Sequence, residues 1–253
     1  MKILVTFALE NEFAPWRKLR RFRRISVDAW DQTYEAKVGS VDVRVLLTGA
    51  GRFAAQRCLG QAFDYKPDIC VASGLSGGLK AAHRPGAILA ARSVEDIQGT
   101  RLMRSDPQLI AGAREYGASV VEKFLVSDRV ISTAEEKKLL GASADAVDME
   151  SLYILAAAAH NDIRAVAIRA ISDGAESDLP LDFDRAFNER GAVSVPKVLR
   201  QIAARPHRIS GLIRLAHESD RAAAALAGFL DEYVQRVTLD PLPEIGKAEA
   251  LAI

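Results

Sequence analysis

Short apolar runs alternate with amphipathic stretches along most of the chain, a pattern typical of strands that alternate with helices. The apolar runs predict strands over residues 2–8, 41–48, 69–73, 87–91, 119–126, 146–147 and 165–171. Amphipathic spacing predicts helices over residues 52–65, 107–116, 133–140, 151–160 and 209–233, with capping-box signals at 105–108 and 133–136. This alternation predicts an α/β protein with a mainly parallel or mixed sheet.

Two predicted strands in the second half of the chain end in acidic residues. The strand over 146–147 runs into Asp148 and Glu150, and the strand over 165–171 is followed by Asp173. Ligands bind beyond the carboxyl ends of strands in parallel sheets. We therefore expect these three carboxylates to converge on one crevice, although each acid alone would serve equally well as a helix cap or turn residue.

Arg169 is the only charged residue in the apolar strand over 165–171. A buried guanidinium needs an anionic partner. That partner is either one of the neighbouring carboxylates or a bound anion. An arginine and three acids at one strand edge favour a binding site over a set of unrelated turn residues.

The segment 49–54 matches the dinucleotide-binding pattern G-x-G-x-x-A between a predicted strand and a predicted helix. That pattern also requires an acid at the end of the next strand to hold the ribose, and this strand ends at Ala72-Ser73. NAD binding is therefore disfavoured. The glycines still allow a tight turn whose backbone amides approach a ligand.

The segment 74–78 matches G-x-S-x-G, the nucleophile elbow of serine hydrolases. An elbow opens a helix, and Pro85 and Gly86 prevent a long helix here. A triad of Ser76, Asp173 and either His207 or His217 would have the required order, but both histidines lie in the amphipathic tail. A serine esterase using Ser76 remains a less favoured alternative.

Composition sets limits on the class of protein. The 253 residues fit one large domain, and we predict a single domain over 1–238 followed by an extended tail over 239–253. A net charge of +1 creates no field that would favour nucleic acid, and no 18-residue apolar run is present to span a membrane. Cys58 and Cys70 form no spaced pair, so neither a disulfide nor a metal site is expected. A cytoplasmic enzyme is the expectation.

Two polar segments have open interpretations. The segment 17–24 carries six cations in eight residues. Such a run is most often a solvated helix face, and the alternative is contact with an anionic surface such as lipid headgroups or a neighbouring subunit. The loop over 176–181 follows Asp173 and is a candidate lid.

Five motifs in order resemble the nucleoside phosphorylase superfamily, and most of all its 5′-methylthioadenosine/S-adenosylhomocysteine nucleosidases and its hopanoid-associated phosphorylase-like group. The motifs lie at residues 2–12, 49–52, 66–79, 147–151 and 169–173. Together they cover roughly residues 1–180. The acid-Met-Glu motif at 148–150 and the arginine-to-aspartate strand end at 169–173 are the specific ones.

The resemblance implies a three-layer α/β/α fold around a central mixed, mainly parallel sheet, with a helical C-terminal tail. It also implies cleavage of the N-glycosidic bond of a purine, adenine-type nucleoside, by water rather than phosphate. A bulky or lipid-linked 5′ substituent and a homodimer are further expectations. No cofactor is implied, apart from phosphate as co-substrate if the protein is a phosphorylase. The alternatives are a purine nucleoside phosphorylase and a non-catalytic nucleoside-binding protein.

The resemblance also implies residue roles. Asp173 would protonate the leaving base, and Glu12 would activate the attacking water. Glu150 would bind the ribose hydroxyls, Met149 would pack under the sugar, and Arg169 would orient Glu12 or bind phosphate. The further substrate-binding residues expected are Asp148, Gly51, Arg52, Gly74, Ser76, Gly77 and Val130.

Three positions depart from the family pattern. Leu75 stands where a serine or threonine is usual, Val130 where the nucleosidases place an aromatic residue, and Asp148 where a glutamate is usual. These changes imply either an altered substrate or lost activity. The segment 8–12 lacks the Gly-x-x-x-Arg phosphate loop of phosphorylases, which favours water.

Overall fold

The computed structural model describes residues 1–26, 32–183, 194, 197–198, 200–201 and 208–237. Its strands are β1 (Lys2–Phe7), β2 (Arg23–Arg24), β3 (Gln32–Val38), β4 (Val41–Leu47), β5 (Ile69–Ala72), β6 (Leu75–Gly78), β7 (Ile88–Asp96), β8 (Leu102–Arg104), β9 (Ser119–Val126), β10 (Ala146–Asp148) and β11 (Arg164–Asp173). Its helices are α1 (Glu10–Arg20), α2 (Arg52–Ala62), α3 (Pro107–Glu115), α4 (Ala134–Leu140), α5 (Ser151–His160) and α7 (Ile209–Arg236), with a 3-10 turn at Phe63–Tyr65. The tail predicted over 239–253 lies outside the described residues.

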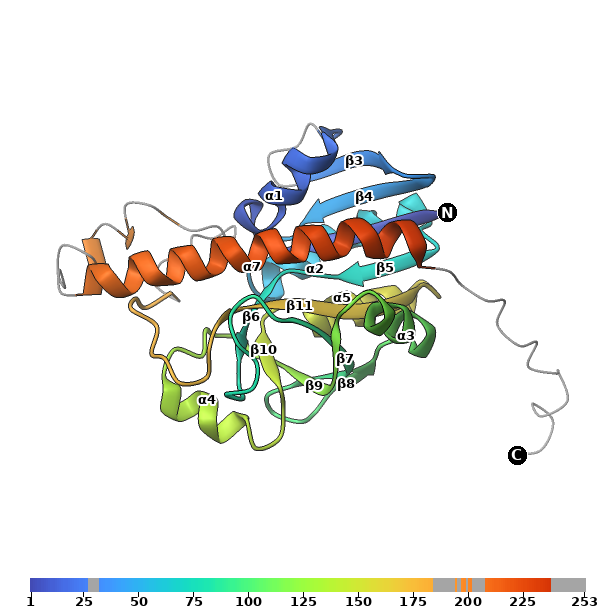
Figure 1. Cartoon of the computed structure of the whole chain (residues 1–253). Coiled ribbons are helices and arrows are strands. Elements are labelled where there is room, and N and C mark those ends of the chain that lie inside the picture. Colours follow the sequence, from blue (N-terminus) through green and yellow to red (C-terminus); the bar gives the residue numbers. More distant parts are fainter. Residues whose placement is uncertain (27–31, 184–193, 195–196, 199, 202–207, 238–253) are drawn as a thin grey trace, which may run out of the picture.

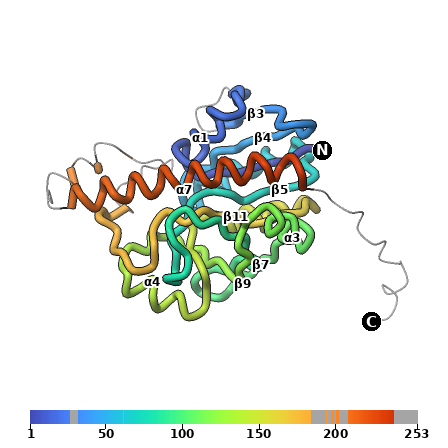
Figure 2. Tube along the Cα trace, viewed as in Figure 1, coloured from blue at the N-terminus to red at the C-terminus, as the bar shows by residue number. Residues whose placement is uncertain are grey.

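The strands form one mixed sheet in the order β2-β3-β4-β1-β5-β11-β6-β10-β9-β7-β8. Strand β1 pairs in parallel with β4 and β5, and β11 pairs in parallel with β5 and β6. Figure 2 shows the N-terminal strands at one side of β11 and β7 and β9 at the other. The carboxyl ends of β1, β5 and β11 therefore meet at one edge.

Strand β11 has three partners. It pairs with β5 along 164–167, with β7 along 167–170 and with β6 along 170–173. Because β7 leads back through β9 and β10 to β6, these strands close on themselves around the end of β11. This closure explains how Arg169, in the middle of β11, is only 1 % exposed.

Successive side chains of β1 pack against two different layers of helices. Ile3, Val5 and Phe7 pack into a core with α1, α3 and α7, whereas Leu4 packs into a second core with α2 and α5. Side chains of a strand alternate between the two faces of its sheet, so helices cover both faces. Figure 1 shows α7 lying across one face and α2 and α5 behind the sheet. The predicted three-layer α/β/α architecture is confirmed.

Helix starts follow the capping chemistry. Asp106 caps α3 by accepting hydrogen bonds from the amides of Gln108 and Leu109, with Pro107 in the first turn. Thr133 caps α4 through the amide of Glu136. Side-chain oxygens at these positions satisfy amides that have no partner within the helix.

The predicted tail helix is a single element, α7, whose two halves differ. Leu226, Leu230 and Tyr233 in its C-terminal half are fully buried, whereas Ile209 and Ile213 near its start are exposed. In Figure 1 the start of α7 projects beyond the sheet. None of the helices in the described parts of the chain has the length and apolar character needed to cross a bilayer.

Some predicted elements were wrong in detail. The segment 74–78, for which no strand was predicted, contains strand β6, and the strand predicted to end at 91 continues as β7 to Asp96. Strand β3 and the start of α1 were not predicted. The β6 error arose because its sequence, Leu-Ser-Gly-Gly, has low strand propensity and is held by pairing with β10 and β11.

Candidate active site

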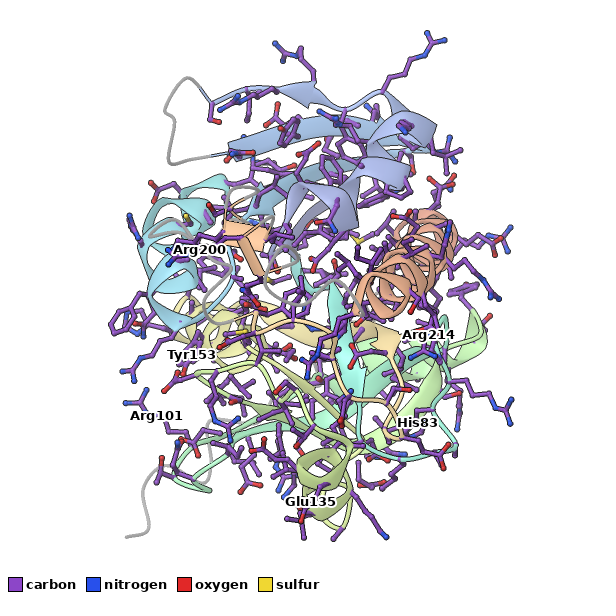
Figure 3. The ribbon with its side chains drawn as sticks, turned by 90° about the vertical axis from the view of Figure 1, so that its left-hand side faces the viewer. His83, Arg101, Glu135, Tyr153, Arg200 and Arg214 are labelled. Atoms are coloured by element: carbon purple, nitrogen blue, oxygen red, sulfur yellow. The ribbon has the colours of Figure 1, made fainter. Side chains whose placement is uncertain are left out.

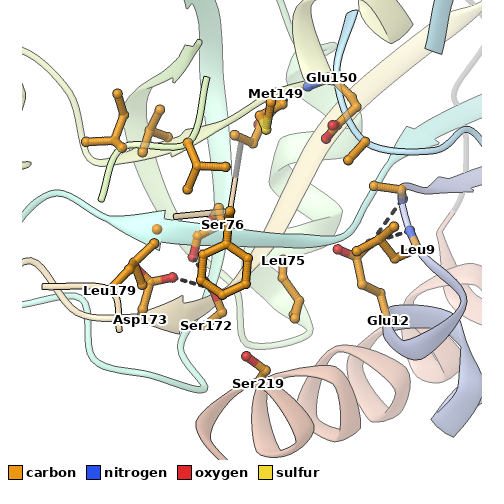
Figure 4. A pocket seen from close by; sticks show the side chains of 18 of the residues that line it. Leu9, Glu12, Leu75, Ser76, Met149, Glu150, Ser172, Asp173, Leu179 and Ser219 are labelled. Carbon is orange, nitrogen blue, oxygen red and sulfur yellow. Dashed lines mark hydrogen bonds between the residues drawn. The ribbon is translucent and has the colours of Figure 1, made fainter. Parts of the chain in front are cut away.

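A cavity of about 240 Å³ lies beyond the carboxyl ends of β1, β10 and β11. Glu12 and Glu150 line one side of it and Asp173 lines the other, with Leu75 and Ser76 between them (Figure 4). The predicted convergence of strand-end carboxylates is therefore present. A nucleoside-sized ligand that enters this cavity meets acids on two sides.

Glu12 reaches the cavity from the first turn of α1, directly after β1. Its Oε2 accepts hydrogen bonds from the backbone amides of Ala8 at 3.0 Å and Leu9 at 3.4 Å. Burial raises the pKa of this carboxyl from 4.5 to about 7, although nearby Arg169 and the backbone amides act in the opposite direction. A carboxyl with a pKa near neutrality can accept a proton during turnover.

Glu150 faces the cavity from the turn between β10 and α5. Its Oε1 accepts a 2.6 Å hydrogen bond from the amide of Gly51, and its Oε2 lies 3.8 Å from Nη2 of Arg169. Burial raises its pKa to about 8; Arg169 lowers the pKa and the neighbouring Asp148 raises it. Glu150 is thus held in place through Oε1, while Oε2 can accept from a hydroxyl donor.

Asp148 supports the site without offering free oxygens to it. Its Oδ1 accepts from the amides of Glu150 and Ser151, both at 2.8 Å, and its Oδ2 accepts from the Ser151 hydroxyl at 2.6 Å. Oδ2 also accepts from Nε of Arg169 at 3.1 Å. This carboxylate therefore caps α5 and anchors Arg169. Asp148 is the anionic partner that the buried arginine requires.

Each nitrogen of the Arg169 guanidinium donates to the protein. Besides Nε, Nη2 donates to the Ser151 hydroxyl at 2.8 Å and Nη1 to the carbonyl oxygen of Ser73 at 2.8 Å. Gly74 makes this approach possible: a Cβ there would lie 2.3 Å from Nη1 of Arg169 and 2.9 Å from Oε2 of Glu12. The φ of Gly74 is +140°, a conformation that also favours glycine.

Asp173 lies at the end of β11, held by two donors. The Ser172 hydroxyl donates to Oδ1 at 2.6 Å, and the ammonium of Lys137 donates to Oδ2 at 2.5 Å. Gly77 allows close packing, because a Cβ there would lie 3.3 Å from Oδ2. Sequence reasoning missed Lys137. The available signal was its spacing of three residues from both Ala134 and Leu140, which places all three on one face of α4.

The family model of the phosphorylase superfamily matches residues 2–204 of the chain. The chain belongs to the phosphorylase superfamily. The family and the class of enzyme predicted from the five motifs are thereby confirmed.

Solved structures of nucleosidases share the fold of this phosphorylase-superfamily chain. The Campylobacter jejuni 5′-methylthioadenosine/S-adenosylhomocysteine nucleosidase has a TM-score of 0.70 at 16 % identity, covering 93 % of this chain and 99 % of that one. The Streptococcus pyogenes S-adenosylhomocysteine nucleosidase has a TM-score of 0.71 at 15 % identity, covering 94 % and 98 %. The Helicobacter pylori futalosine hydrolase has a TM-score of 0.70 at 16 % identity, covering 92 % and 98 %.

The other predicted binding residues of this superfamily member divide into two groups. Ser76, Gly77, Val130 and Met149 line the cavity, whereas Gly51, Arg52 and Gly74 do not. Gly51 acts through its backbone amide. The Arg52 guanidinium lies 5.6 Å from the ring centre of Tyr153, which Figure 3 shows on the opposite side of the view from His83. The substrate-binding role predicted for Arg52 stays a prediction.

Ser76 has a distinctive environment. It is 4 % exposed, and no atom in the described parts of the chain forms a hydrogen bond with its hydroxyl. A buried hydroxyl without a partner costs free energy, so it is suited to bind a ligand group. Its position on strand β6 differs from a nucleophile elbow, which leads into a helix.

The loop predicted as a lid forms part of the cavity wall. Leu179 lines the cavity, and its amide donates to the carbonyl oxygen of Ser132 at 2.8 Å. Asp178 accepts a 2.7 Å hydrogen bond from the amide of Ala134. Phe183 continues this wall, and α7 adds Leu215 and Ser219, which the sequence reasoning did not assign to the site.

Proposed function

We propose that the protein cleaves the N-glycosidic bond of a purine nucleoside, with water as the nucleophile. The observation that carries this proposal is the presence of Glu12, Glu150 and Asp173 around one cavity of nucleoside size. Glycoside cleavage needs an acid for the leaving group and a base for water, placed on opposite sides of the sugar. The division of the acids between two walls of the cavity supports this arrangement.

The reaction assigns one role to each acid. Asp173 gives its proton to a ring nitrogen of the base, and the electron pair of the breaking bond passes to the base. Glu12 takes a proton from water as the water oxygen bonds to the sugar's anomeric carbon. Glu150 accepts hydrogen bonds from the ribose hydroxyls, and Met149 packs under the sugar. The products are the free base and the free sugar.

Water is favoured over phosphate by the state of Arg169. Its guanidinium already contacts Asp148, Ser151 and the carbonyl oxygen of Ser73. Glu12, a carboxylate when it acts as base, would repel a phosphate dianion at the same position. A phosphorylase reaction is the alternative within the same site.

An adenine-type nucleoside with a bulky, apolar 5′ substituent is the substrate we favour. The cavity wall near α7 is mainly apolar, with Leu179, Phe183 and Leu215 contributing to it beside the hydroxyl of Ser219. Burial of an apolar substituent there contributes about 25 cal/mol for each Å² removed from water. A lipid-linked substituent, as the resemblance to the hopanoid-associated group suggests, would use the same wall.

A panel of nucleosides assayed for free base, with and without phosphate, tests the proposal. We expect base release that does not require phosphate and that is faster for 5′-alkyl than for 5′-hydroxyl nucleosides. Strict dependence on phosphate would establish phosphorolysis instead. Tight binding without base release would establish a non-catalytic nucleoside-binding protein.

Contact with an anionic membrane is a further proposal, supported by exposed cations in the basic segment 17–24. Lys18, Arg21 and Arg23 are exposed, whereas Arg20 is paired with Asp231. We expect binding to anionic vesicles that is lost at high salt, because exposed charges are screened. Flotation without salt dependence would reject the contact. Sedimentation of the purified protein would test the homodimer that the resemblance implies.

A further inference from the structure

Lys137 places a fully buried ammonium behind the acid assigned to the leaving base. Its side chain is 0 % exposed, and its Nζ donates to Oδ2 of Asp173 at 2.5 Å. The same Nζ donates to the carbonyl oxygens of Gly174 at 3.0 Å and Ser177 at 3.1 Å. Lys137 does not line the cavity, whereas Asp173 does, so the ammonium contacts the carboxyl from the protein side.

Three acceptors around one nitrogen require the charged form of lysine. An ammonium has three N–H donors, and each of the three acceptors here takes one. A buried ammonium is costly unless it is paired and its hydrogen bonds are complete. The carboxylate form of Asp173 supplies the countercharge, and Oδ2 of the protonated form still accepts the hydrogen bond, so the lysine and the acid form one unit.

Asp173 is held on both of its oxygens. Ser172 donates to Oδ1 and Lys137 donates to Oδ2, while Gly77 packs against the carboxyl. Two donors from different elements, β11 and α4, restrict rotation of the carboxyl group. An acid must be aligned with the lone pair that it protonates, so such restriction matters for proton transfer.

We propose that Lys137 is the positioning residue of the general acid Asp173, an inference that rests on the proposed function. Lys137 orients the carboxyl and stabilises the carboxylate that remains after the proton is transferred. In this step the O–H bond at Oδ1 of Asp173, the oxygen that does not contact Lys137, breaks and an N–H bond forms on the leaving base, which takes the electron pair of the glycosidic bond. Lys137 keeps all of its own protons.

Lys137 also joins the acid to the cavity wall. Its bonds to Gly174 and Ser177 hold the chain directly after β11, which continues to Leu179 in the wall. A structural role alone would therefore affect every substrate equally. A role in proton donation affects only substrates whose leaving group needs a proton, and this difference separates the two.

The experiment compares Lys137→Gln with Lys138→Gln, a matched control on the same helix whose side chain is exposed. Each variant is assayed with a purine nucleoside and with 4-nitrophenyl ribofuranoside, whose leaving group departs without protonation. We expect Lys137→Gln to lower kcat for the purine nucleoside about 10- to 100-fold, with less than about threefold change for the nitrophenyl riboside. Lys138→Gln leaves both rates unchanged.

Equal losses on both substrates would overturn the proposal in favour of a purely structural role, and no loss on either would remove Lys137 from the mechanism. A double-mutant cycle with Asp173→Asn gives a second measurement. We expect Lys137→Gln to have little further effect on purine nucleoside cleavage in the Asp173→Asn background, because Lys137 acts through that carboxyl. Multiplied losses would contradict this.

If Lys137→Gln alone is too unstable to purify, Asp173→Asn is still compared with the double variant, which removes both buried charges together, and a further loss in the double variant overturns the proposal. The wild-type protein keeps the two proposals apart. If the wild type and Lys137→Gln release base at the same rate, only the role of Lys137 is rejected. A wild-type protein that releases no base from any nucleoside rejects the proposed function itself.

Discussion

The backbone amide of Gly51 donates a 2.6 Å hydrogen bond to the carboxylate of Glu150, joining residues 99 positions apart in the chain. Gly51 has a φ of +89°, and a Cβ there would lie 3.7 Å from the terminal methyl of Met149. The glycine turn that resembles a dinucleotide motif thus orients an acid of the site. The glycine pattern indicates that the backbone comes close to another group. In this chain that group is the carboxylate of Glu150.

The two buried glutamates predict an unusual dependence of stability on pH. Their folded pKa values, about 7 for Glu12 and about 8 for Glu150, lie above the ordinary value of 4.5. Between these limits the folded protein binds more protons than the unfolded chain, so the free energy of unfolding decreases as pH rises from about 5 to 8. The decrease then levels off, and for Glu12 it amounts to roughly 3 kcal/mol.

Urea denaturation of Glu150→Gln at pH 5 and pH 8 checks this prediction. We expect the variant to gain stability relative to the wild type at pH 8 and to gain little at pH 5, because glutamine carries no charge to bury. Glu176→Gln, an exposed control, should keep the wild-type profile. A wild-type stability that rises between pH 5 and pH 8 would contradict the raised pKa values.

Glu12→Gln should separate water activation from binding. We expect kcat to fall about 100-fold or more, with less than about threefold change in nucleoside affinity measured by equilibrium dialysis. In the wild type kcat/KM should rise through about pH 7 as Glu12 loses its proton, and the variant should lack this limb. Lost binding together with unchanged residual chemistry would show that Glu12 does not activate water.

Asp173→Asn should retain the fold and lower base release about 100-fold or more, since a general acid contributes at least that much. The variant should also unfold at lower temperature, because the Lys137 ammonium loses its countercharge. Free base by chromatography and a thermal melt measure the two effects. Near-normal turnover would remove Asp173 from the mechanism.

Gly74→Ala should disrupt the hydrogen bond from Nη1 of Arg169 to the carbonyl oxygen of Ser73. The new Cβ would meet Nη1 of Arg169 at 2.3 Å, in addition to the strain of a φ of +140°. Gly86→Ala is the matched control, because Gly86 has a φ of +91° but nothing within 4 Å of a Cβ. We expect Gly86→Ala to cost about 1–3 kcal/mol of unfolding free energy from backbone strain, and Gly74→Ala to cost more. Equal losses would show that the guanidinium moves away freely.

Ser76→Ala tests whether the unpartnered hydroxyl binds substrate. One net hydrogen bond contributes about 1 kcal/mol, so we expect KM to rise about fivefold with kcat little changed. Stability should not fall, because the free protein loses no hydrogen bond in the described parts of the chain. Ser119→Ala, an exposed control at the start of β9, should change neither quantity. Covalent labelling of wild-type Ser76 by a fluorophosphonate would support the esterase alternative instead.

The comparison of Asp148 with Glu150 shows how far sequence reasoning reaches. Both follow the same short strand, and both were expected in the crevice. In the structure the carboxylate of Asp148 is occupied by the amides that open α5, by Ser151 and by Arg169. Glu150, two residues later, keeps an oxygen available near the cavity. The amino-acid sequence contains no signal that distinguishes the supporting role of Asp148 from the cavity-facing role of Glu150.

The sequence by itself determined the order of most strands and helices and the placement of Glu150 and Asp173 at the ends of strands. These features depend on local periodicity. Glu150 meets Asp173 because β10, which runs antiparallel to β6, is part of the closed set of strands around β11. Tertiary structure alone decided that Lys137 pairs with Asp173, that β6 forms from a glycine-rich segment and that α7 supplies Leu215 to the wall. Each of those depends on desolvation and pairing between distant segments, which local sequence does not encode.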